Sequence, residues 1–341
     1  MKTAVKRKSL LKTMLVAIGF AATLSLPAIS QAAPEDTMTV TLLGTGTPIL
    51  NVNRFGMSTL VEAGKQKLLF DAGRGAAIRL HQLQVPLRDV NAVFITHLHS
   101  DHLTGLPDLY ASAPLPTDDG RRTRPMELYG PVGIDNVANG IKLMFTDNNR
   151  IRENGKEVVA AATDIDAHAI RDIGGVVYQK DGVVVRAFLV DHGHVQPAYG
   201  YSVEYAGRSV VLSGDTTYAP NLVASAKGAD LLVHCISVGS RELEKAHPEY
   251  VNHFYEYLAN PETVSRILNE TRPRDAVLSH ISLYSKGEIG RATEQEIIQR
   301  VSKSYDGNYL IGQDLMRFVL TPKGVKRMPY QAVQRQIEPT N

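Results

Sequence analysis

Three histidines and an aspartate lie within six positions in the segment VFITHLHSDHLTGLPD, residues 93–108. His97, His99, Asp101 and His102 follow an apolar run, in a chain with only 11 histidines among 341 residues. Alternate side chains of an extended chain point the same way, so His97 and His99 face one side together. Burying this many ionisable groups without a cation would be costly, and imidazole and carboxylate suit zinc and, less exclusively, iron or manganese. The cluster therefore predicts metal binding, with His97 and His99 serving one ion, and Asp101 and His102 another.

Further metal-type ligands follow three other apolar, strand-like runs. AFLVDHGHV ends in His192 and His194, VVLSGDTTY contains Asp215, and AVLSHIS contains His280. Active sites of α/β proteins lie at the carboxyl ends of strands, so we expect these side chains to join the cluster at residues 97–102. Alternation along the chain allows either His192 or His194 to point inwards.

Strands and helices must bring these residues together. Apolar patterns predict strands within 38–48, 58–73, 90–96, 182–190, 198–205, 208–215, 229–235 and 275–280, and helices at 75–83, 261–270 and 293–305. Early strands dominate, and strands then alternate with helices, which is typical of an α/β chain whose one or two sheets are covered by helices. We expect residues 112–126 to form a long loop, residues 145–172 a weakly helical lid, and residues 322–341 a polar tail.

Residues 1–32 have the layout of a secretory signal peptide, with five Lys or Arg residues, an apolar run and then small residues. We expect cleavage after Ala32, a periplasmic or secreted protein, and no stable membrane anchor. Subtracting the five cations from the net charge of +2 leaves −3, so the mature protein has no excess of positive charge to attract nucleic acid. Cys235 is the only cysteine, which excludes an internal disulfide, and we expect it to be a buried, inert thiol.

The motifs THLHSDH, LSGDT and LSHIS, with LLGTGTP and FDAGRG upstream, resemble the metallo-β-lactamase superfamily. They are most similar to its ribonuclease Z and exported arylsulfatase-like branch, over most of residues 38–285. The resemblance implies an α/β fold, a single-domain αββα sandwich that we place at residues 33–321, with a two-metal site between the sheets. It also implies a ligand set: His97, His99 and His192 for one ion, Asp101, His102 and His280 for the other, and Asp215 as the bridge.

The resemblance also bears on residues around these ligands. Asp71, in FDAG, would accept a hydrogen bond that orients a ligand histidine, or is simply a turn-forming aspartate. VDHG followed by PAYGY runs as in the exported arylsulfatase-like branch and favours His192 as a ligand, whereas counting back from YGY in the ribonuclease Z manner favours His194. Asp101 and His253 are the catalytic candidates. His253 would be a general acid, and the alternative for it is a half-exposed helical histidine.

These observations predict an exported hydrolase with two zinc ions, iron or manganese being the alternatives. Two cations roughly 3.5–4 Å apart can share a water and lower its pKa towards about 7, which would supply a bridging hydroxide as the nucleophile. The predicted substrates are small anionic esters, either an aryl sulfate or a phosphodiester. The alternatives are a ribonuclease Z-like phosphodiesterase or nuclease and a non-catalytic metal-binding protein. A β-lactamase or lactonase ranks last, because zinc β-lactamases generally lack a bridging aspartate like that in SGDT.

The connection between Tyr201 and Asp215 bears on the size of the substrate. Only residues 202–214 separate the two, and they predict a simple hairpin that turns at Ala206-Gly207. Ribonuclease Z-like enzymes place a long RNA-gripping arm in this connection. We therefore expect a small-molecule substrate, no specific nucleic-acid partner and no processing of transfer RNA. The sequence leaves the oligomeric state open.

Overall fold

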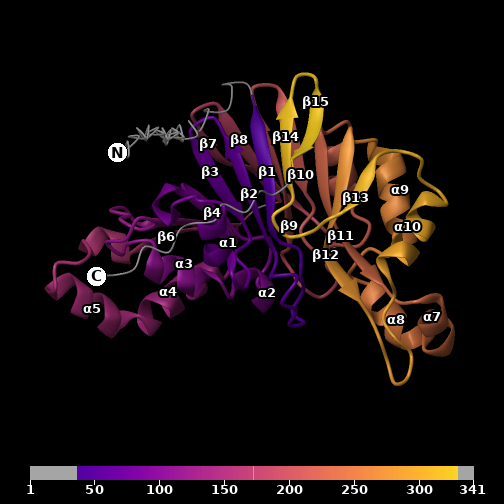
Figure 1. Cartoon of the computed structure of the whole chain (residues 1–341), viewed down its shortest axis with the longest axis horizontal. Coiled ribbons are helices and arrows are strands. Elements are labelled where there is room, and N and C mark those ends of the chain that lie inside the picture. Colours follow the sequence, from indigo (N-terminus) through magenta and orange to yellow (C-terminus); the bar gives the residue numbers. More distant parts are fainter. Residues whose placement is uncertain (1–36, 172, 329–341) are drawn as a thin grey trace, which may run out of the picture. The chain divides into compact units, whose positions relative to one another are not determined.

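The computed structural model describes residues 37–171 and 173–328, so the predicted signal peptide lies outside the described residues. Two β-sheets, one of eight strands and one of seven, form the centre of the fold (Figure 1). The first sheet has the order β15-β14-β1-β2-β3-β4-β5-β6, and the second has the order β13-β12-β11-β10-β9-β8-β7. The predicted αββα sandwich is confirmed.

The strands of the first sheet are β1 (Met38–Gly44), β2 (Ser58–Ala63), β3 (Gln66–Phe70), β4 (Ala92–Phe94), β5 (Met126–Pro131), β6 (Ile165–Ile170), β14 (Arg317–Thr321) and β15 (Gly324–Met328). Those of the second sheet are β7 (Gly174–Lys180), β8 (Val183–Leu189), β9 (Tyr199–Tyr205), β10 (Arg208–Leu212), β11 (Leu231–Val238), β12 (Asp275–Leu283) and β13 (Tyr309–Ile311).

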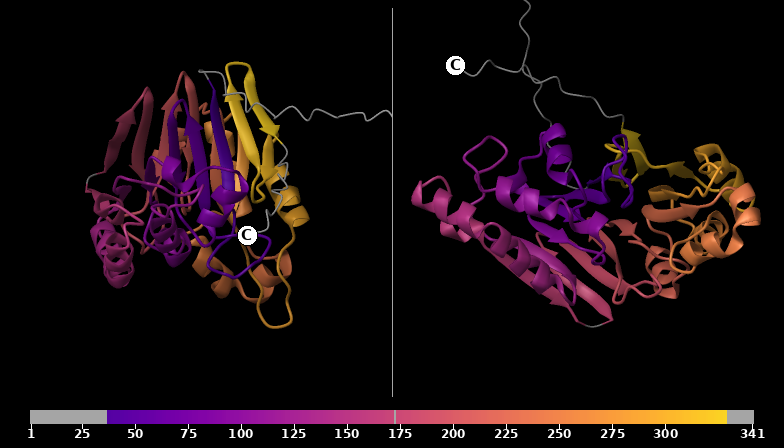
Figure 2. Two further views of the ribbon diagram at one scale, coloured as in Figure 1. Left: turned by 60° about the vertical axis from the view of Figure 1, so that its left-hand side comes forward. Right: turned by 90° about the horizontal axis from the view of Figure 1, so that it is seen from below.

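The helices lie on the outer faces of the two sheets (Figure 2). Those of the first half of the chain are α1 (Ala76–Gln82), α2 (Ser100–Leu103), α3 (Leu106–Ser112), α4 (Ile134–Met144) and α5 (Thr146–Asn154), with short 3₁₀ turns at Leu87–Asp89 and Ala160–Thr163. Those of the second half are α6 (Pro220–Ala226), α7 (Arg241–Ala246), α8 (Pro248–Tyr255), α9 (Pro261–Thr271) and α10 (Glu294–Ser302). Asn260 caps α9: its side-chain oxygen accepts a hydrogen bond from the amide of Thr263 at 2.8 Å.

Three apolar cores hold these layers together. The inner core lies between the sheets and includes Val40 of β1 and Val233 of β11. The second packs α1, α3 and α4 against the first sheet, and the third packs α6, α9 and α10 against the second sheet. Central strand β11 is buried on both faces, because alternate residues point into the inner and the third core.

Two hydrogen bonds tie the sheets together immediately before the histidine cluster. The hydroxyl of Tyr201, on β9, donates to the carbonyl of Ile95 at 2.7 Å, and the amide of Tyr199 donates to the carbonyl of Thr96 at 2.9 Å. Ile95 and Thr96 follow β4 in the other sheet. These links fix the position of the chain from which His97 starts.

Three of the sequence expectations are wrong. Residues 165–170, which we expected in a lid, form β6 and pair with β5 at the edge of the first sheet. Residues 324–328, which we expected in the polar tail, form β15 and pair with β14. His280 does not follow its strand but lies inside β12 at a bulge, where its φ is 43°. Bulges of this kind redirect a side chain next to a site.

The predicted hairpin between Tyr201 and Asp215 is confirmed. Strands β9 and β10 pair antiparallel and turn at Ala206 and Gly207, whose φ values are 48° and 72°. Two successive residues with positive φ are typical of a tight two-residue turn. In the part of the chain that the structure describes, helices are too short or too polar to cross a membrane.

Candidate metal centre

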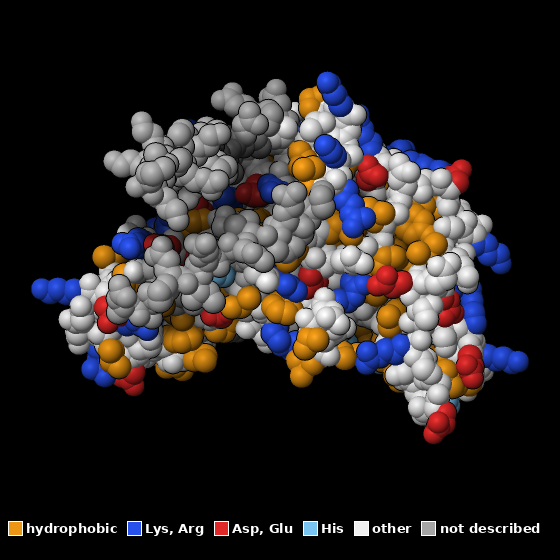
Figure 3. Space-filling model, viewed as in Figure 1, with side chains coloured by type: hydrophobic (Ala, Val, Ile, Leu, Met, Phe, Trp, Pro, Cys, Tyr) orange, Lys and Arg blue, Asp and Glu red, His pale blue; other side chains and the backbone are white. Residues whose placement is uncertain are grey.

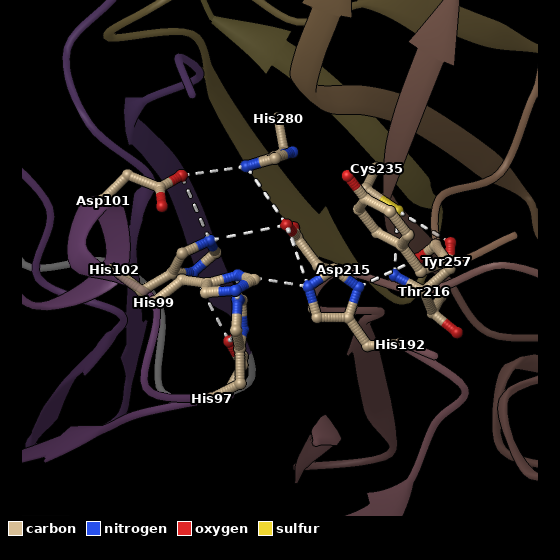
Figure 4. Close-up of polar contacts among 12 residues, drawn as sticks. His97, His99, Asp101, His102, His192, Asp215, Thr216, Cys235, Tyr257 and His280 are labelled. Atoms are coloured by element: carbon tan, nitrogen blue, oxygen red, sulfur yellow. Dashed lines mark hydrogen bonds and ion pairs between the residues drawn. The ribbon is translucent and has the colours of Figure 1, made fainter. Parts of the chain in front are cut away.

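Six of the seven predicted ligands are almost fully buried, and they come from four separate loops or strands. His97, Asp101 and His102 follow β4, His192 follows β8, Asp215 follows β10, and His280 lies in β12. His99, the seventh, is partly exposed. Figure 4 shows that the side chains of all seven converge on one small region.

The first group consists of His97, His99 and His192. The Nδ1 atom of His99 lies 2.9 Å from Nε2 of His97 and 3.3 Å from Nε2 of His192. The Nδ1 atom of His192 donates to the carbonyl of Tyr257 at 2.9 Å, which leaves Nε2 of the neutral ring with its lone pair facing the group. Burial lowers the pKa of each of these three histidines, so the neutral, metal-binding form is favoured.

The second group consists of Asp101, His102 and His280. Oδ2 of Asp101 lies 3.0 Å from Nε2 of His280 and 3.4 Å from Nε2 of His102. Asp215 lies between the two groups: its Oδ2 is 3.2 Å from Nε2 of His280, 3.7 Å from Nε2 of His102 and 3.9 Å from Nε2 of His192. A single carboxylate oxygen thus faces imidazole nitrogens of both groups.

Asp71 contacts His102, as the resemblance implies. Its buried Oδ2 accepts a hydrogen bond from Nδ1 of His102 at 2.7 Å, and its Oδ1 accepts one from the amide of Thr96 at 2.9 Å. The alternative turn role also holds, because Asp71 has a φ of 56°. Asp71 therefore fixes the tautomer of His102, with the Nε2 lone pair directed towards Asp101 and Asp215.

The acidic side chains of the second group attract positive charge. Burial would lower the pKa of His102, but the charges of Asp71, Asp215 and Asp101 outweigh it and raise the pKa well above its ordinary value. Burial would raise the pKa of Asp215, but His280 and His102 hold it well below its usual range. Nε2 of His102 and Oδ1 of Asp215 are both buried without a hydrogen-bond partner. A divalent cation would satisfy these atoms, so the residues present fit a metal site.

The structure separates the two histidines that the sequence left open. His192 is buried within the first group, whereas His194 is exposed and its ring packs against that of Tyr257, with 5.8 Å between ring centroids. Gly193, between them, has a φ of 60°, and a Cβ atom there would lie 2.9 Å from Cβ of Tyr257. The turn at Gly193 directs the two histidines apart.

We expect His192→Ala to lose metal and His194→Ala to retain it. The reason is that only His192 places a nitrogen lone pair beside His97 and His99. Elemental analysis of the two variants, purified in parallel with the parent protein, measures the difference. Loss of metal by His194→Ala alone would show that the assignment of His192 is wrong.

The structure does not bring His253 into either group. It lies on α8, its side chain is exposed, and its ring packs against those of Phe254 and Tyr257 at centroid distances of 5.6 and 5.7 Å. Its role as a general acid stays a prediction. The ring of Tyr257 contacts those of both His253 and His192. The sequence did not single out Tyr257, because its backbone carbonyl makes the hydrogen bond to His192, and a residue of any type carries that group.

Residues 255–259 support two of the ligand loops. The carbonyl of Tyr257 accepts from His192, and the amide of Ala259 donates to the carbonyl of Thr216, next to Asp215, at 2.8 Å. The carbonyl of Ala259 accepts from the amide of Ser237 in β11 at 2.9 Å. This segment therefore joins the loop of His192, the loop of Asp215 and the central strand β11.

Helices α7 and α8 are tied down at their base by a buried arginine. Arg300 of α10 donates to Glu244 at 2.8 Å, to Glu262 at 2.7 Å and to the carbonyl of Gly239 at 3.0 Å. The hydroxyl of Tyr255 accepts from the amide of Gly239 at 2.9 Å and donates to Glu244 at 2.7 Å. The two ends of the α7–α8 excursion are thus held at the same point of the fold.

Comparison with known proteins agrees with this fold and site. Residues 66–281 match the model of the beta-lactamase superfamily domain, so the chain belongs to the beta-lactamase superfamily and is one of its metal-dependent hydrolases of the metallo-β-lactamase fold. Among curated relatives, it is 32% identical to a ribonuclease Z of Mycobacterium sp. (strain KMS) over 83% of this chain and 96% of that protein. It is 38% identical to a ribonuclease Z of Mycobacterium marinum over 58% of this chain and 70% of that protein.

Solved structures show the same fold. The metallo-beta-lactamase fold protein YhfI from Bacillus subtilis superposes with a TM-score of 0.61 at 18% identity, covering 83% of this chain and 99% of that one. Human tRNase Z, short form, superposes with a TM-score of 0.58 at 22% identity, covering 82% of this chain and 98% of that one. At these identities the likeness concerns the fold.

Proposed function

We propose that the protein is a phosphodiesterase that holds two divalent ions, preferably zinc, in the two groups joined by Asp215. The observation that carries the proposal is the position of Oδ2 of Asp215, which faces imidazole nitrogens of both groups at 3.2 to 3.9 Å. Two ions held there would supply Lewis acidity and lower the pKa of a bound water. Asp71 and the carbonyl of Tyr257 would keep His102 and His192 in the metal-binding tautomer.

The names of the relatives favour one ester type over the other. Relatives that align with 83% of this chain are named ribonuclease Z. This favours phosphodiester hydrolysis over aryl sulfate hydrolysis. The main sequence hypothesis allowed both esters, and the ribonuclease Z-like phosphodiesterase was its first alternative. Export to the periplasm or the outside remains part of the proposal and rests on residues 1–32 alone.

The surroundings of the site favour a small diester. A cavity of about 600 Å³ opens beside His192, bordered by residues 189–193 and 196–198. Pockets for small molecules are typically about 300–1,000 Å³, and His192 is the one predicted ligand among the residues that border this cavity. The tight turn at Ala206 and Gly207 extends no arm from the sheet for gripping a folded RNA.

A substrate panel tests the proposal. The purified protein, supplied with zinc or manganese, should hydrolyse bis(p-nitrophenyl) phosphate, and a chelator should abolish the turnover. The aryl sulfate p-nitrophenyl sulfate, a β-lactam and a lactone should be turned over much more slowly. Hydrolysis of the sulfate ester without that of the diester would contradict the proposal, and metal binding without any turnover would favour the non-catalytic alternative.

We expect no position-specific trimming of a precursor transfer RNA, in spite of the names of the relatives. RNA binding needs many cationic contacts to phosphates. Among the described residues on the face drawn in Figure 3, Lys and Arg side chains are interspersed with Asp and Glu rather than gathered in one surface. Gel analysis of a labelled precursor, with a ribonuclease Z as positive control, measures the outcome. Efficient cleavage at one position would place the nuclease hypothesis first.

A further inference from the structure

Tyr257 combines a fixed backbone with a side chain that remains accessible beside the metal centre. Its carbonyl accepts from His192, and its Cβ packs against Gly193. The half-buried ring lies against the ring of His192, with 5.4 Å between centroids and an angle of 72° between the planes. The ring thus stands at the wall of the site without belonging to either ligand group (Figure 4).

The hydroxyl of Tyr257 differs from those of neighbouring tyrosines. Tyr255 donates to Glu244, Tyr250 donates to the carbonyl of Ser285, and the hydroxyl of Tyr284 accepts from Ser237. Among the described residues, no partner accepts from or donates to the hydroxyl of Tyr257. Among these residues the donor is therefore free, on a ring that packs against the ring of the ligand His192.

A hydrogen-bond donor beside the metal ions would stabilise a substrate oxyanion in this site. The ion pairs of Asp101 and Asp215 among the described residues are all with histidines, so no Arg or Lys is tied into the centre. Fixed hydrogen-bond donors aimed at developing negative charge are the usual means of stabilising a transition state. A neutral phenol would supply such a donor without competing with the imidazoles for the metal ions.

We propose that the hydroxyl of Tyr257 donates a hydrogen bond to a non-bridging phosphoryl oxygen of the substrate. The inference rests on the proposed function, and it makes Tyr257 a catalytic residue of the same site. It also explains the position of His253: the tyrosine ring separates that exposed histidine from His192, so His253 contacts the substrate-binding wall from the outside.

Removal of the single hydroxyl tests the proposal. Tyr257→Phe keeps the ring and the backbone carbonyl, and Tyr250→Phe is the matched control, since it removes a hydroxyl from the same aromatic group. Three quantities are measured on the metal-loaded proteins: metal content, the Kd of inorganic phosphate by calorimetry, and kcat/KM for bis(p-nitrophenyl) phosphate. For Tyr257→Phe we expect unchanged metal content, phosphate binding weakened about tenfold and kcat/KM lowered about a hundredfold. Tyr250→Phe should match the parent protein.

The outcomes separate this inference from the proposed function. If the parent protein hydrolyses no diester but Tyr257→Phe still weakens phosphate binding, the hydrogen bond from Tyr257 to phosphate is supported and the proposed phosphodiesterase activity is refuted. Unchanged phosphate affinity and kcat/KM in Tyr257→Phe would overturn the contact while leaving the phosphodiesterase intact. Loss of metal by Tyr257→Phe would overturn it as well, in favour of a structural role. If His253→Asn reproduces the losses and Tyr257→Phe does not, the general-acid prediction for His253 replaces it.

Discussion

Replacing Asp215 by alanine is expected to remove at least one of two metal ions and to lower kcat by on the order of a thousandfold or more. Its Oδ2 faces His280, His102 and His192, so one substitution removes a ligand from both groups. A metal ion contributes several kcal/mol to stabilising a transition state, and each 1.36 kcal/mol or so corresponds to a tenfold change in rate. Elemental analysis and steady-state kinetics with bis(p-nitrophenyl) phosphate measure the two effects.

Two further variants sharpen this test. Asp215→Asn keeps the shape of the side chain and removes its charge, so it separates the need for a negative bridge from the need for packing. Asp166→Ala is the matched control, because Asp166 is an exposed aspartate on β6 at the edge of the first sheet. A full metal complement and the parental rate in Asp215→Ala would refute the shared carboxylate.

Removing the metal ions should lower the melting temperature by on the order of 10 °C. Ions that bind only the native chain raise its free energy of unfolding by about 4 kcal/mol when present at a thousand times their Kd. In a chain of this size, about 1 kcal/mol shifts the melting temperature by a few degrees. The effect arises because segments at residues 97–102, 192, 215 and 280 must all be in place to form the groups. Without a cation, Nε2 of His102 and Oδ1 of Asp215 stay buried and unpaired.

Thermal unfolding of the parent protein before and after exhaustive chelation measures this stabilisation. Titration of zinc back into the chelated protein should restore the melting temperature and reach two equivalents per chain. His194→Ala is a suitable control, since its exposed side chain lies outside both groups and the variant should follow the parent curve. One equivalent or none at saturation would sink the two-ion arrangement.

The ligand residues could be predicted from the sequence because their chemistry restricts them. Buried imidazoles and carboxylates at the ends of apolar strands are costly unless they meet, and the structure brings all seven together. The sequence pattern could not decide between His192 and His194 as the ligand, because the alternation of side chains along an extended chain allows either of them to point inwards. The choice depends on the backbone at Gly193 and the ring of Tyr257.

The parts of the fold that the sequence did not predict are those with weak apolar patterns. Strands β6 and β7 lie at sheet edges, and many of their side chains are exposed, so they lack the continuous apolar run of β11. The bulge at His280 depends on how β12 pairs with β11, which no local pattern encodes. Tyr257 acts through its carbonyl, a group that every residue carries, so residue type gave no signal.

Helices α7 and α8 form an excursion whose two ends are held at one point of the fold, which has an evolutionary consequence. Gly239 meets Tyr255 at the base of the excursion, and Arg300 clasps both ends to α10. Lengthening or exchanging a loop whose ends are already fixed adds little conformational entropy to the cost of folding. Exposed residues of this excursion, such as Lys245, Glu249 and Asn252, can therefore change, whereas Val251 is buried against Leu243 and Tyr284. A directed-evolution library confined to these exposed positions would vary the surface of the excursion at little risk to the fold.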